Sequence, residues 1–363
     1  MRLGVEAALV GDKFVPGDVE VVDGVITGYG LAAANGQGIA APGMVDLQVN
    51  GFAGVDLMGA DAEGYRRVGE AVLETGVTAY LPTFISAPEP HLLAALHGVP
   101  IETDGPRILG AHLEGPFISK ARLGIHPPSA RRDPDPELLE RLLAAGPVRL
   151  VTLAPELPGA DALIDLLLER GITVSCGHTD ATADEALHAF DRGAKTVTHL
   201  FNAMRPFRHR DPGLAGAALA REDVVVQIIL DGVHLAEETA RVVWQSAAGR
   251  VALVTDAVAG AGMGDGSYLL GGFEVEVRDG TVRGPEGVLA GSSLTMIDAV
   301  RNLHALGVPL EQALAASSTV PARVIGLPTL GRIDIDFPAD MVVLDDNLDI
   351  DRVFVGGQAR VVA

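Results

Sequence analysis

The segment 148–178, VRLVTLAPELPGADALIDLLLERGITVSCGH, decides the fold class. Its first part, Val148–Pro155, and its last part, Ile172–His178, are short apolar runs of the kind found in buried strands. Between them, Asp161–Arg170 has the apolar spacing of a helix. A strand, a helix and a second strand in this order are typical of a unit in which a helix joins two parallel strands.

The same alternation continues along the chain on both sides of this segment. Eight strand-like runs can be distinguished, and helical patterns separate most of them. They are Met44–Asn50, Val77–Thr83, Arg107–Glu114, Val148–Pro155, Ile172–His178, Lys195–His199, Val225–Asp231 and Val251–Asp256. Eight such strands predict an α/β fold of the (β/α)8 TIM-like barrel type. An open, doubly wound sheet is the second possibility.

Both ends of the chain are rich in strand patterns. An Asp23-Gly24 turn predicts a hairpin near the start, and short Val-rich runs follow Asp340. We therefore expect residues 1–42 and 328–363 to form one small β-sandwich domain, and residues 43–327 to form the barrel. Within the barrel, Tyr268–Val277 and Gly280–Val288 are expected to form an inserted hairpin, followed by helices over 293–306 and 310–325.

Composition excludes several classes of protein. The chain has 363 residues, with 27 Lys and Arg against 48 Asp and Glu, which gives a net charge of −21. This charge argues against general binding to nucleic acid or to anionic membranes. The single cysteine, Cys176, excludes an internal disulfide framework and a zinc site made of four cysteines. Together with the lack of a signal-peptide pattern, it favours a cytoplasmic protein.

Ionisable residues gather where the predicted strands end. Glu114, His178, His199 and Asp256 each end a different strand. The carboxyl ends of barrel strands build the active site, and two His with one carboxylate are a common catalytic metal shell. Glu114, His178 and His199 therefore predict a metal site, and Asp256 would take a proton from the attacking water. Any one of these residues alone could instead be an ordinary polar group at a strand end.

Longer motifs resemble the amidohydrolase superfamily and, within it, the family of N-acetylglucosamine-6-phosphate deacetylases. The matching segments are Pro42–Gly51, His112–Phe117, Gly177–Thr179, Thr198–Met204, Asp211–Gly216, Asp231–His234, Thr255–Ala257 and Leu289–Ser292. The most diagnostic is Thr198-His-Leu-Phe-Asn-Ala-Met204. The resemblance implies hydrolysis of N-acetylglucosamine 6-phosphate to glucosamine 6-phosphate and acetate, in amino-sugar catabolism and cell-wall recycling, with Asp256 as general base and then acid.

The resemblance also assigns residues to the substrate. His126 would lie near the acetyl carbonyl or the sugar hydroxyls, and Asn202 and the backbone of Ala203 would bind the sugar. His234 and Arg210 would contact the sugar and its phosphate. A homodimer is implied, in which Arg210 acts in its own site or in that of the neighbouring subunit.

One departure concerns the number of metal ions. Many members of the superfamily have His-x-His at the end of the first strand, whereas this chain has Gln48 and Asn50. Amides are poor ligands for a zinc-like ion, so we expect one divalent ion per subunit, with Gln48 and Asn50 in supporting roles. Zinc is expected first, and iron, cobalt, manganese or cadmium are alternatives. His112, two residues before Glu114, either supports that carboxylate or is a packed core residue.

Other functions stay open at this point. The alternative is deacetylation of N-acetylgalactosamine 6-phosphate or action on another amidohydrolase substrate. N-acetylgalactosamine 6-phosphate differs from the expected substrate in the orientation of one hydroxyl group, which the sequence alone does not distinguish. A catalytically silent scaffold protein is disfavoured, because no ligand or acid–base residue is missing. Dinucleotide binding is weaker still, since the glycines of Gly260–Gly266 do not lie between a strand and a helix. In the basic segment Arg205–Arg210, only Arg210 has a family counterpart.

Overall fold

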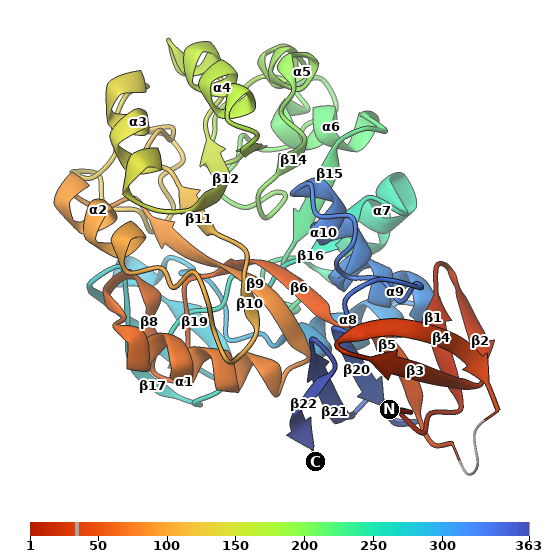
Figure 1. Ribbon diagram of the computed structural model, residues 1–363. Helices are drawn as coiled ribbons and strands as arrows, with labels where there is room; N and C mark the ends of the chain where they lie inside the picture. Colours follow the sequence, from red (N-terminus) through yellow and green to blue (C-terminus); the bar gives the residue numbers. More distant parts are fainter. Residues whose placement is uncertain (33–35, 363) are drawn as a thin grey trace.

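The computed structural model describes residues 1–32 and 36–362, and its centre is a ring of eight parallel strands wrapped by helices (Figure 1). The strands of the ring are β6 (Met44–Val49), β9 (Val77–Ile85), β11 (Ala111–Glu114), β12 (Val148–Leu153), β13 (Thr173–Cys176), β14 (Thr196–Val197), β15 (Val225–Ile228) and β16 (Val251–Leu253). Each lies within or overlaps one of the eight predicted runs. The predicted barrel is confirmed, and the open sheet is not observed.

The ring closes between β16 and β6 through a short contact instead of a long ladder. A single bridge joins Val49 to Ala257, and the backbone N–H of Asn50 donates to the Ala257 carbonyl at 2.8 Å. Below this bridge, the Thr255 hydroxyl donates to the Asp46 carboxylate at 2.6 Å. Asp46 is buried, so this hydrogen bond joins the first and last strands inside the protein.

One predicted strand is divided in the structure. The run Arg107–Glu114 forms β10 (Arg107–Ile108), which pairs with β9, and then β11. The break falls at Gly110, whose φ of +113° suits glycine and interrupts an extended strand. A Cβ at this position would lie 3.2 Å from the Arg149 Cβ on β12.

The helices of the described residues are α1 (Ala62–Leu73), α2 (Glu89–His97), α3 (Pro136–Ala145), α4 (Ala160–Glu169), α5 (Ala183–Arg192), α6 (Gly213–Ala220), α7 (Glu237–Ala247), α8 (Met296–Ala305), α9 (Leu310–Ser317) and α10 (Thr319–Val324). A capping side chain begins four of them, α1, α3, α5 and α8. The Asp61 carboxylate accepts from the Gly64 N–H to begin α1. The predicted helix 310–325 is divided into α9 and α10 at Ser318, where the backbone has non-helical angles.

The two ends of the chain share one sheet beside the barrel. Its strand order is β2-β1-β5-β20-β21-β22, and β5 pairs with β20 across about 300 positions of sequence. Bounds are β1 (Ala7–Val10), β2 (Lys13–Pro16), β3 (Asp18–Val22), β4 (Val25–Leu31), β5 (Ile39–Pro42), β20 (Met341–Leu344), β21 (Ile350–Val355) and β22 (Gln358–Val362). β3 and β4 form the predicted hairpin at Asp23-Gly24. The expected β-rich unit made by both termini is confirmed; its boundaries at 42 and 328 stay predictions.

The inserted segment differs from its prediction. It forms three strands, β17 (Gly266–Leu270), β18 (Phe273–Arg278) and β19 (Thr281–Arg283), not one two-stranded hairpin. The first turn falls at Gly271-Gly272, inside the predicted strand Tyr268–Val277, and both glycines have positive φ. The remaining short elements are β7 (Gly51–Phe52), β8 (Val55–Asp56), η1 (Leu57–Gly59) and η2 (Pro285–Gly287).

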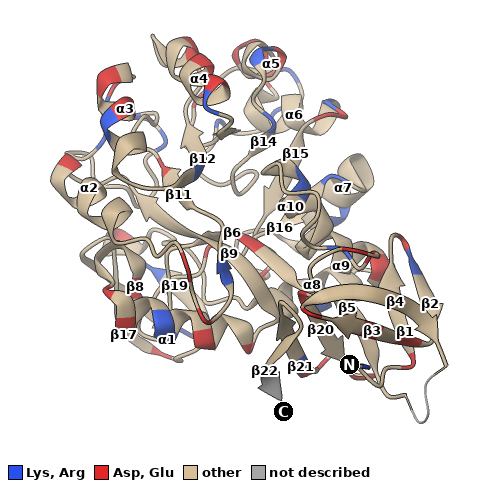
Figure 2. Cartoon of the chain, in the orientation of Figure 1, with Lys and Arg blue, Asp and Glu red and all other residues tan. Residues whose placement is uncertain are grey.

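The acidic composition is visible on the outside of the molecule. Figure 2 shows acidic residues on the outer helices, such as α3, α4 and α5, interleaved with basic ones. None of the helices in the described part of the chain combines the length and the apolar character that crossing a membrane requires.

Candidate active site

Three of the predicted ligands converge at the carboxyl end of the barrel. Glu114 ends β11, and His178 and His199 each follow their strand by two residues. The Glu114 Oε1 atom lies 3.1 Å from His178 Nε2 and 2.9 Å from His199 Nε2, and the two imidazole nitrogens are 3.1 Å apart. All three residues are buried. The ligand atoms lie within 4.8 Å of one another, which is close enough to hold one metal ion.

The donor set fits a divalent cation. The His178 ring donates from Nδ1 to the Arg122 carbonyl at 3.0 Å, which leaves a lone pair on Nε2. That lone pair faces the Glu114 carboxylate, so two acceptors point at the same space. A cation bound between them removes this repulsion, and one carboxylate with two imidazoles suits a catalytic metal site.

Histidine neighbours keep the Glu114 carboxylate ionised. Burial raises the pKa of Glu114, but the pKa is held well below its usual value in the metal-free chain, where a proton on a facing nitrogen of His126, His178 or His199 is donated to the carboxylate. Such a proton removes the repulsion between acceptors, as a bound cation does. Gln48 adds a hydrogen bond from Nε2 to Glu114 Oε1 at 3.0 Å. Glu114 is therefore an anionic ligand across the neutral pH range.

Asp256 lies opposite this cluster, three residues after the end of β16. Asn50 donates from Nδ2 to Asp256 Oδ1 at 2.7 Å, which leaves Oδ2 without that partner. In the metal-free chain, burial and then the negative charge of Glu114 raise the pKa of Asp256 to about 8. A bound cation acts in the opposite direction and favours the ionised base.

The backbone at these positions is strained. His178, His199 and Asp256 have φ values of +47°, +30° and +51°, in the left-handed region that residues other than glycine rarely adopt. Each residue lies just past the end of its strand, where the chain turns sharply out of the barrel. Such strain gathers at functional sites, where the surrounding structure holds it.

Gln48 and Asn50 occupy the expected supporting positions. Their amide nitrogens are used by the carboxylates of Glu114 and Asp256, respectively. The amide oxygens, Gln48 Oε1 and Asn50 Oδ1, are buried and have no hydrogen-bond partner among the described residues. Both side chains therefore orient the two carboxylates through hydrogen bonds.

A cavity of about 280 Å³ opens above the cluster. The cavity is lined by the three candidate metal ligands, by Asp256 and by four of the residues expected to bind substrate, which are His126, Asn202, Ala203 and His234. The inserted segment covers the cavity with the apolar side chains of Leu270, Val288 and Leu289. Among the described residues, no Lys or Arg lines this cavity.

Arg210 lies outside this cavity. The backbones of Arg208 and Asp211 bond each other in both directions, so His209 and Arg210 form the exposed tip of a tight turn. Arg205, in the same basic segment, is tied to Asp211 at 2.8 Å and to Asp180 at 3.3 Å. Arg205 therefore fixes the base of the turn.

The structure also places His112 and Cys176. His112 is fully buried, and its ring bonds the Leu47 carbonyl at 3.1 Å and the Thr152 hydroxyl at 2.7 Å. Its partners thus belong to the barrel interior, and burial lowers the pKa of His112 to about 4. Cys176 is a buried free thiol.

Sequence reasoning missed the residues that orient the site. Ser86 faces the Nδ1 atom of His126, and Asp231 bonds the Nδ1 atom of His234 at 2.7 Å. The Arg122 carbonyl holds His178. The three-residue spacing of Asp231 and His234 was a usable signal. Ser86 and Arg122 come from other segments of the chain, so nothing in their sequence context predicts the contact.

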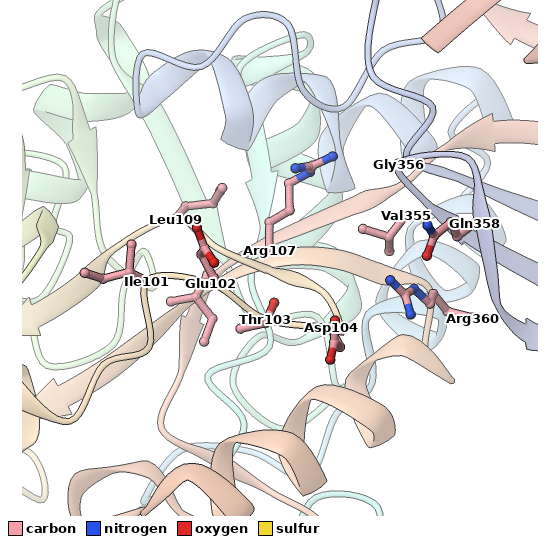
Figure 3. Close-up of a pocket in the computed structure, with 12 residues that line it drawn as sticks. Ile101, Glu102, Thr103, Asp104, Arg107, Leu109, Val355, Gly356, Gln358 and Arg360 are labelled. Carbon is pink, nitrogen blue, oxygen red and sulfur yellow. The ribbon is translucent and has the colours of Figure 1, made fainter. Parts of the chain in front are cut away.

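A larger cavity, of about 730 Å³, lies at the other end of the barrel. It is bounded by the loop 101–106, which precedes β10, and by the turn between β21 and β22 (Figure 3). Arg107 at its edge is already paired with Asp340 at 2.6 Å. The described residues that line this cavity include no histidine or cysteine, so the smaller cavity above the metal cluster is the candidate active site.

Comparison with known proteins agrees with this geometry. The model of the amidohydrolase family matches residues 39–360. The N-acetylglucosamine-6-phosphate deacetylase of Homo sapiens is 39% identical over 339 residues, which cover 88% of this chain and 83% of that protein. The N-acetylgalactosamine-6-phosphate deacetylase of Escherichia coli O157:H7 is 35% identical over 328 residues, covering 88% of this chain and 87% of that protein.

A solved structure is similar over nearly its whole length. It is an aspartate-to-alanine variant of the N-acetyl-D-glucosamine-6-phosphate deacetylase from Mycobacterium smegmatis, in complex with N-acetyl-D-glucosamine-6-phosphate. The two chains are 35% identical, superimpose with a TM-score of 0.93, and are each covered to 98%. The barrel fold, the three candidate metal ligands and the comparisons all point to one family: this chain belongs to the amidohydrolase family.

Proposed function

We propose that this chain deacetylates N-acetylglucosamine 6-phosphate to glucosamine 6-phosphate and acetate. The observation that carries the proposal is the convergence of Glu114, His178, His199 and Asp256 on one cavity, in a chain similar to deacetylases of this substrate. The chemistry is hydrolysis of an amide: water adds to the acetyl carbonyl, and the amine then leaves.

The cation and the side chains divide this chemistry between them. Glu114, His178 and His199 would hold one divalent ion, which supplies Lewis-acid chemistry and lowers the pKa of water. Asp256 takes the proton of the attacking water and returns it to the amine nitrogen, which must be protonated to leave. His126 faces the acetyl group, while Asn202, Ala203 and His234 bind the sugar. Zinc is the first candidate for the ion, and elemental analysis of protein purified without added metal identifies it.

Replacement of the base tests this assignment. The metal-loaded protein should release acetate from N-acetylglucosamine 6-phosphate, and Asp256→Asn should abolish turnover while the metal content stays the same. Acetate is measured with a coupled assay, and metal by elemental analysis. Asp346→Asn, at an exposed position, is the matched control and should keep full activity. A metal-loaded wild-type protein that releases no acetate contradicts the function; an active Asp256→Asn variant removes Asp256 from the role of base.

We infer further that the active protein is a homodimer in the cytoplasm, and that Arg210 binds the phosphate in the neighbouring subunit's site. Among the described residues, no Lys or Arg lines the active-site cavity, whereas the substrate carries a phosphate. Arg210 stands at the exposed tip of its turn. Next to it, Phe207 and Val242 expose 53% and 55% of their surface, an apolar area that suits contact with a second copy.

N-acetylgalactosamine 6-phosphate is the second candidate substrate. The specific observation in its favour is the Escherichia coli relative, whose identity to this chain is close to that of the glucosamine enzymes. The two sugars differ at one hydroxyl group, so a few polar contacts decide between them. Values of kcat/KM measured side by side for both substrates will show which one the site prefers.

A further inference from the structure

Ser86 directs two hydrogen-bond donors at one atom of the active site. It follows the last residue of β9, and its backbone N–H donates to His126 Nδ1 at 3.2 Å. Its hydroxyl oxygen lies 2.9 Å from the same nitrogen. Both residues are buried, Ser86 to 1% exposure and His126 to 2%. No other hydrogen-bond partner of the Ser86 hydroxyl is found among the described residues.

This arrangement determines which ring nitrogen of His126 carries the proton. A backbone N–H can only donate, so Nδ1 must accept and cannot carry a hydrogen itself. A neutral imidazole has one N–H, which is therefore on Nε2. The Ser86 hydroxyl can rotate to donate to Nδ1 as well, and this adds to the preference for the same tautomer.

The other side of the ring faces the reaction. His126 lines the active-site cavity, and its Nε2 lies 3.7 Å from Glu114 Oε2. The ring packs against His178, with centroids 4.3 Å apart. Packing on one side and Ser86 on the other thus fix the orientation of the ring, and its Nε2 faces Glu114 in the active-site cavity.

The residue after the metal ligand leaves room for Ser86. Gly115 has a φ of +86°, and a Cβ at this position would lie 2.4 Å from the Ser86 hydroxyl oxygen. Any side chain here would displace the hydroxyl from His126. Gly115 therefore permits the contact between the end of β9 and the loop that carries His126.

We propose that Ser86 is a positioning residue, which holds His126 with its proton on Nε2 so that this nitrogen donates to the acetyl oxygen as the carbonyl becomes an oxyanion. This inference rests on the proposed function for the identity of the acetyl group. The tautomer itself follows from the geometry of Ser86 and His126. A donor fixed in advance stabilises the transition state more than the bound substrate.

Nuclear magnetic resonance tests the tautomer without an activity measurement. In the full-length, zinc-loaded protein labelled with ¹⁵N-histidine, we expect the His126 signal of a ring protonated at Nε2 and bare at Nδ1. The His126→Gln variant assigns the signal by its loss. In Ser86→Ala, the backbone N–H still donates to Nδ1, so the proton should stay on Nε2, and the Nδ1 resonance should shift because the hydroxyl hydrogen bond is lost. A wild-type signal with the proton on Nδ1 overturns the proposal whatever the enzyme's substrate is.

Kinetics test the role in the reaction. Ser86→Ala should lower kcat roughly 3- to 10-fold, the effect of one weakened hydrogen bond, and leave KM nearly unchanged. Ser86→Thr keeps the hydroxyl and should restore kcat. His126→Gln, whose amide nitrogen reaches the place of Nε2, should retain more activity than His126→Asn, whose amide is closer to Nδ1.

The control is Ser317→Ala, which removes a buried hydroxyl on α9 that bonds the Leu314 carbonyl. It should leave both kcat and the His126 signal unchanged. Wild-type kcat in Ser86→Ala, or a Ser86→Thr variant as slow as Ser86→Ala, overturns the positioning role. If the wild-type protein itself releases no acetate, the proposed function fails, and the resonance measurement alone decides on Ser86.

Discussion

At the scale of single residues, the charge of Asp256 depends on a cation nearby. Burial, followed by repulsion from Glu114, raises the pKa of Asp256 to about 8 in the metal-free chain. The hydrogen bond from Asn50 and the neighbouring His199 act in the opposite direction but do not cancel these effects. The residue proposed as the base is thus protonated at neutral pH until a metal ion binds, and metal binding releases its proton.

The same shift makes the metal-free protein less stable as the pH rises. In the unfolded chain, the pKa of Asp256 is about 3.9. Between about pH 4 and about pH 8, the folded state therefore holds a proton on Asp256 that the unfolded state has lost. The free energy of unfolding should therefore fall with increasing pH, by up to about 1.4 kcal/mol per unit for this group. Urea unfolding of chelator-treated protein at several pH values measures the slope, which Asp256→Asn should reduce.

Zinc-saturated protein is the control for this prediction. A cation beside Asp256 lowers its pKa, so the slope should be smaller with metal bound. Asp46, whose pKa burial raises to about 7, contributes a similar slope that Asp256→Asn leaves in place. Equal slopes in the metal-free wild-type and Asp256→Asn proteins would mean that Asp256 is ionised without the metal.

At the scale of elements, the closure of the barrel depends on side chains. One backbone bridge joins Val49 of β6 to Ala257, which follows β16, and the buried hydrogen bond between Thr255 and Asp46 lies beneath it. Asp46 also accepts from the backbone N–H groups of Gln48 and Thr255, at 3.2 and 3.3 Å. This carboxylate therefore holds together the strands that carry Asn50 and Asp256.

Removal of the Thr255 hydroxyl should weaken the closure. Thr255→Val keeps the shape of the side chain but leaves the buried Asp46 carboxylate without its side-chain partner, so we expect a loss of roughly 1–3 kcal/mol in the free energy of unfolding. Chemical denaturation measures it. Thr27→Val, on the exposed strand β4, is the matched control and should change stability by less than about 0.5 kcal/mol. A loss in Thr255→Val no larger than in this control would contradict the role of the bond.

Local patterns were sufficient to predict most elements, because strands and capped helices leave regular signals. Asp61 marks the start of α1, and the Thr182–Glu185 capping box marks the start of α5. The α6 helix lacks such a signal, since it consists of small and apolar residues buried on several sides. The candidate metal ligands Glu114, His178 and His199 could be predicted because each lies at the end of a strand or two residues past it. The contact between Ser86 and His126 could not, because it depends on how two loops meet in space.

At the scale of the whole molecule, the net charge of −21 and a phosphorylated substrate are compatible only if cations gather locally. Within one chain, no Lys or Arg of the described residues lines the active-site cavity. The turn with Arg210 at its tip is fixed at its base by Arg205 and Asp211, and the Arg210 side chain does not line the cavity of its own chain. In the proposed dimer, Arg210 reaches the active-site cavity of the second copy of the chain.

Mixing an impaired variant, Arg210→Ala, with an inactive one, Asp256→Asn, tests this arrangement. Arg210→Ala alone should lower kcat/KM roughly 10- to 100-fold for the phosphorylated substrate, and much less for N-acetylglucosamine. In mixed dimers of Arg210→Ala and Asp256→Asn, one site of each hybrid has both residues intact if Arg210 acts across the interface. Refolded equimolar mixtures should then recover about a quarter of wild-type activity. Mixtures that recover none, although hybrids have formed, place Arg210 in its own subunit's site.

The sheet shared by both ends of the chain has a consequence for synthesis on the ribosome. β5 ends at Pro42, and its partner β20 begins at Met341. At typical rates of translation, roughly 15–60 s separate their appearance. During this time β5 has an unpaired edge while the barrel strands emerge and fold. Chaperones that act during translation would meet the strands β2-β1-β5 with one edge unpaired, and a ribosome stalled before Met341 would hold a folded barrel beside a β5 edge that still lacks β20.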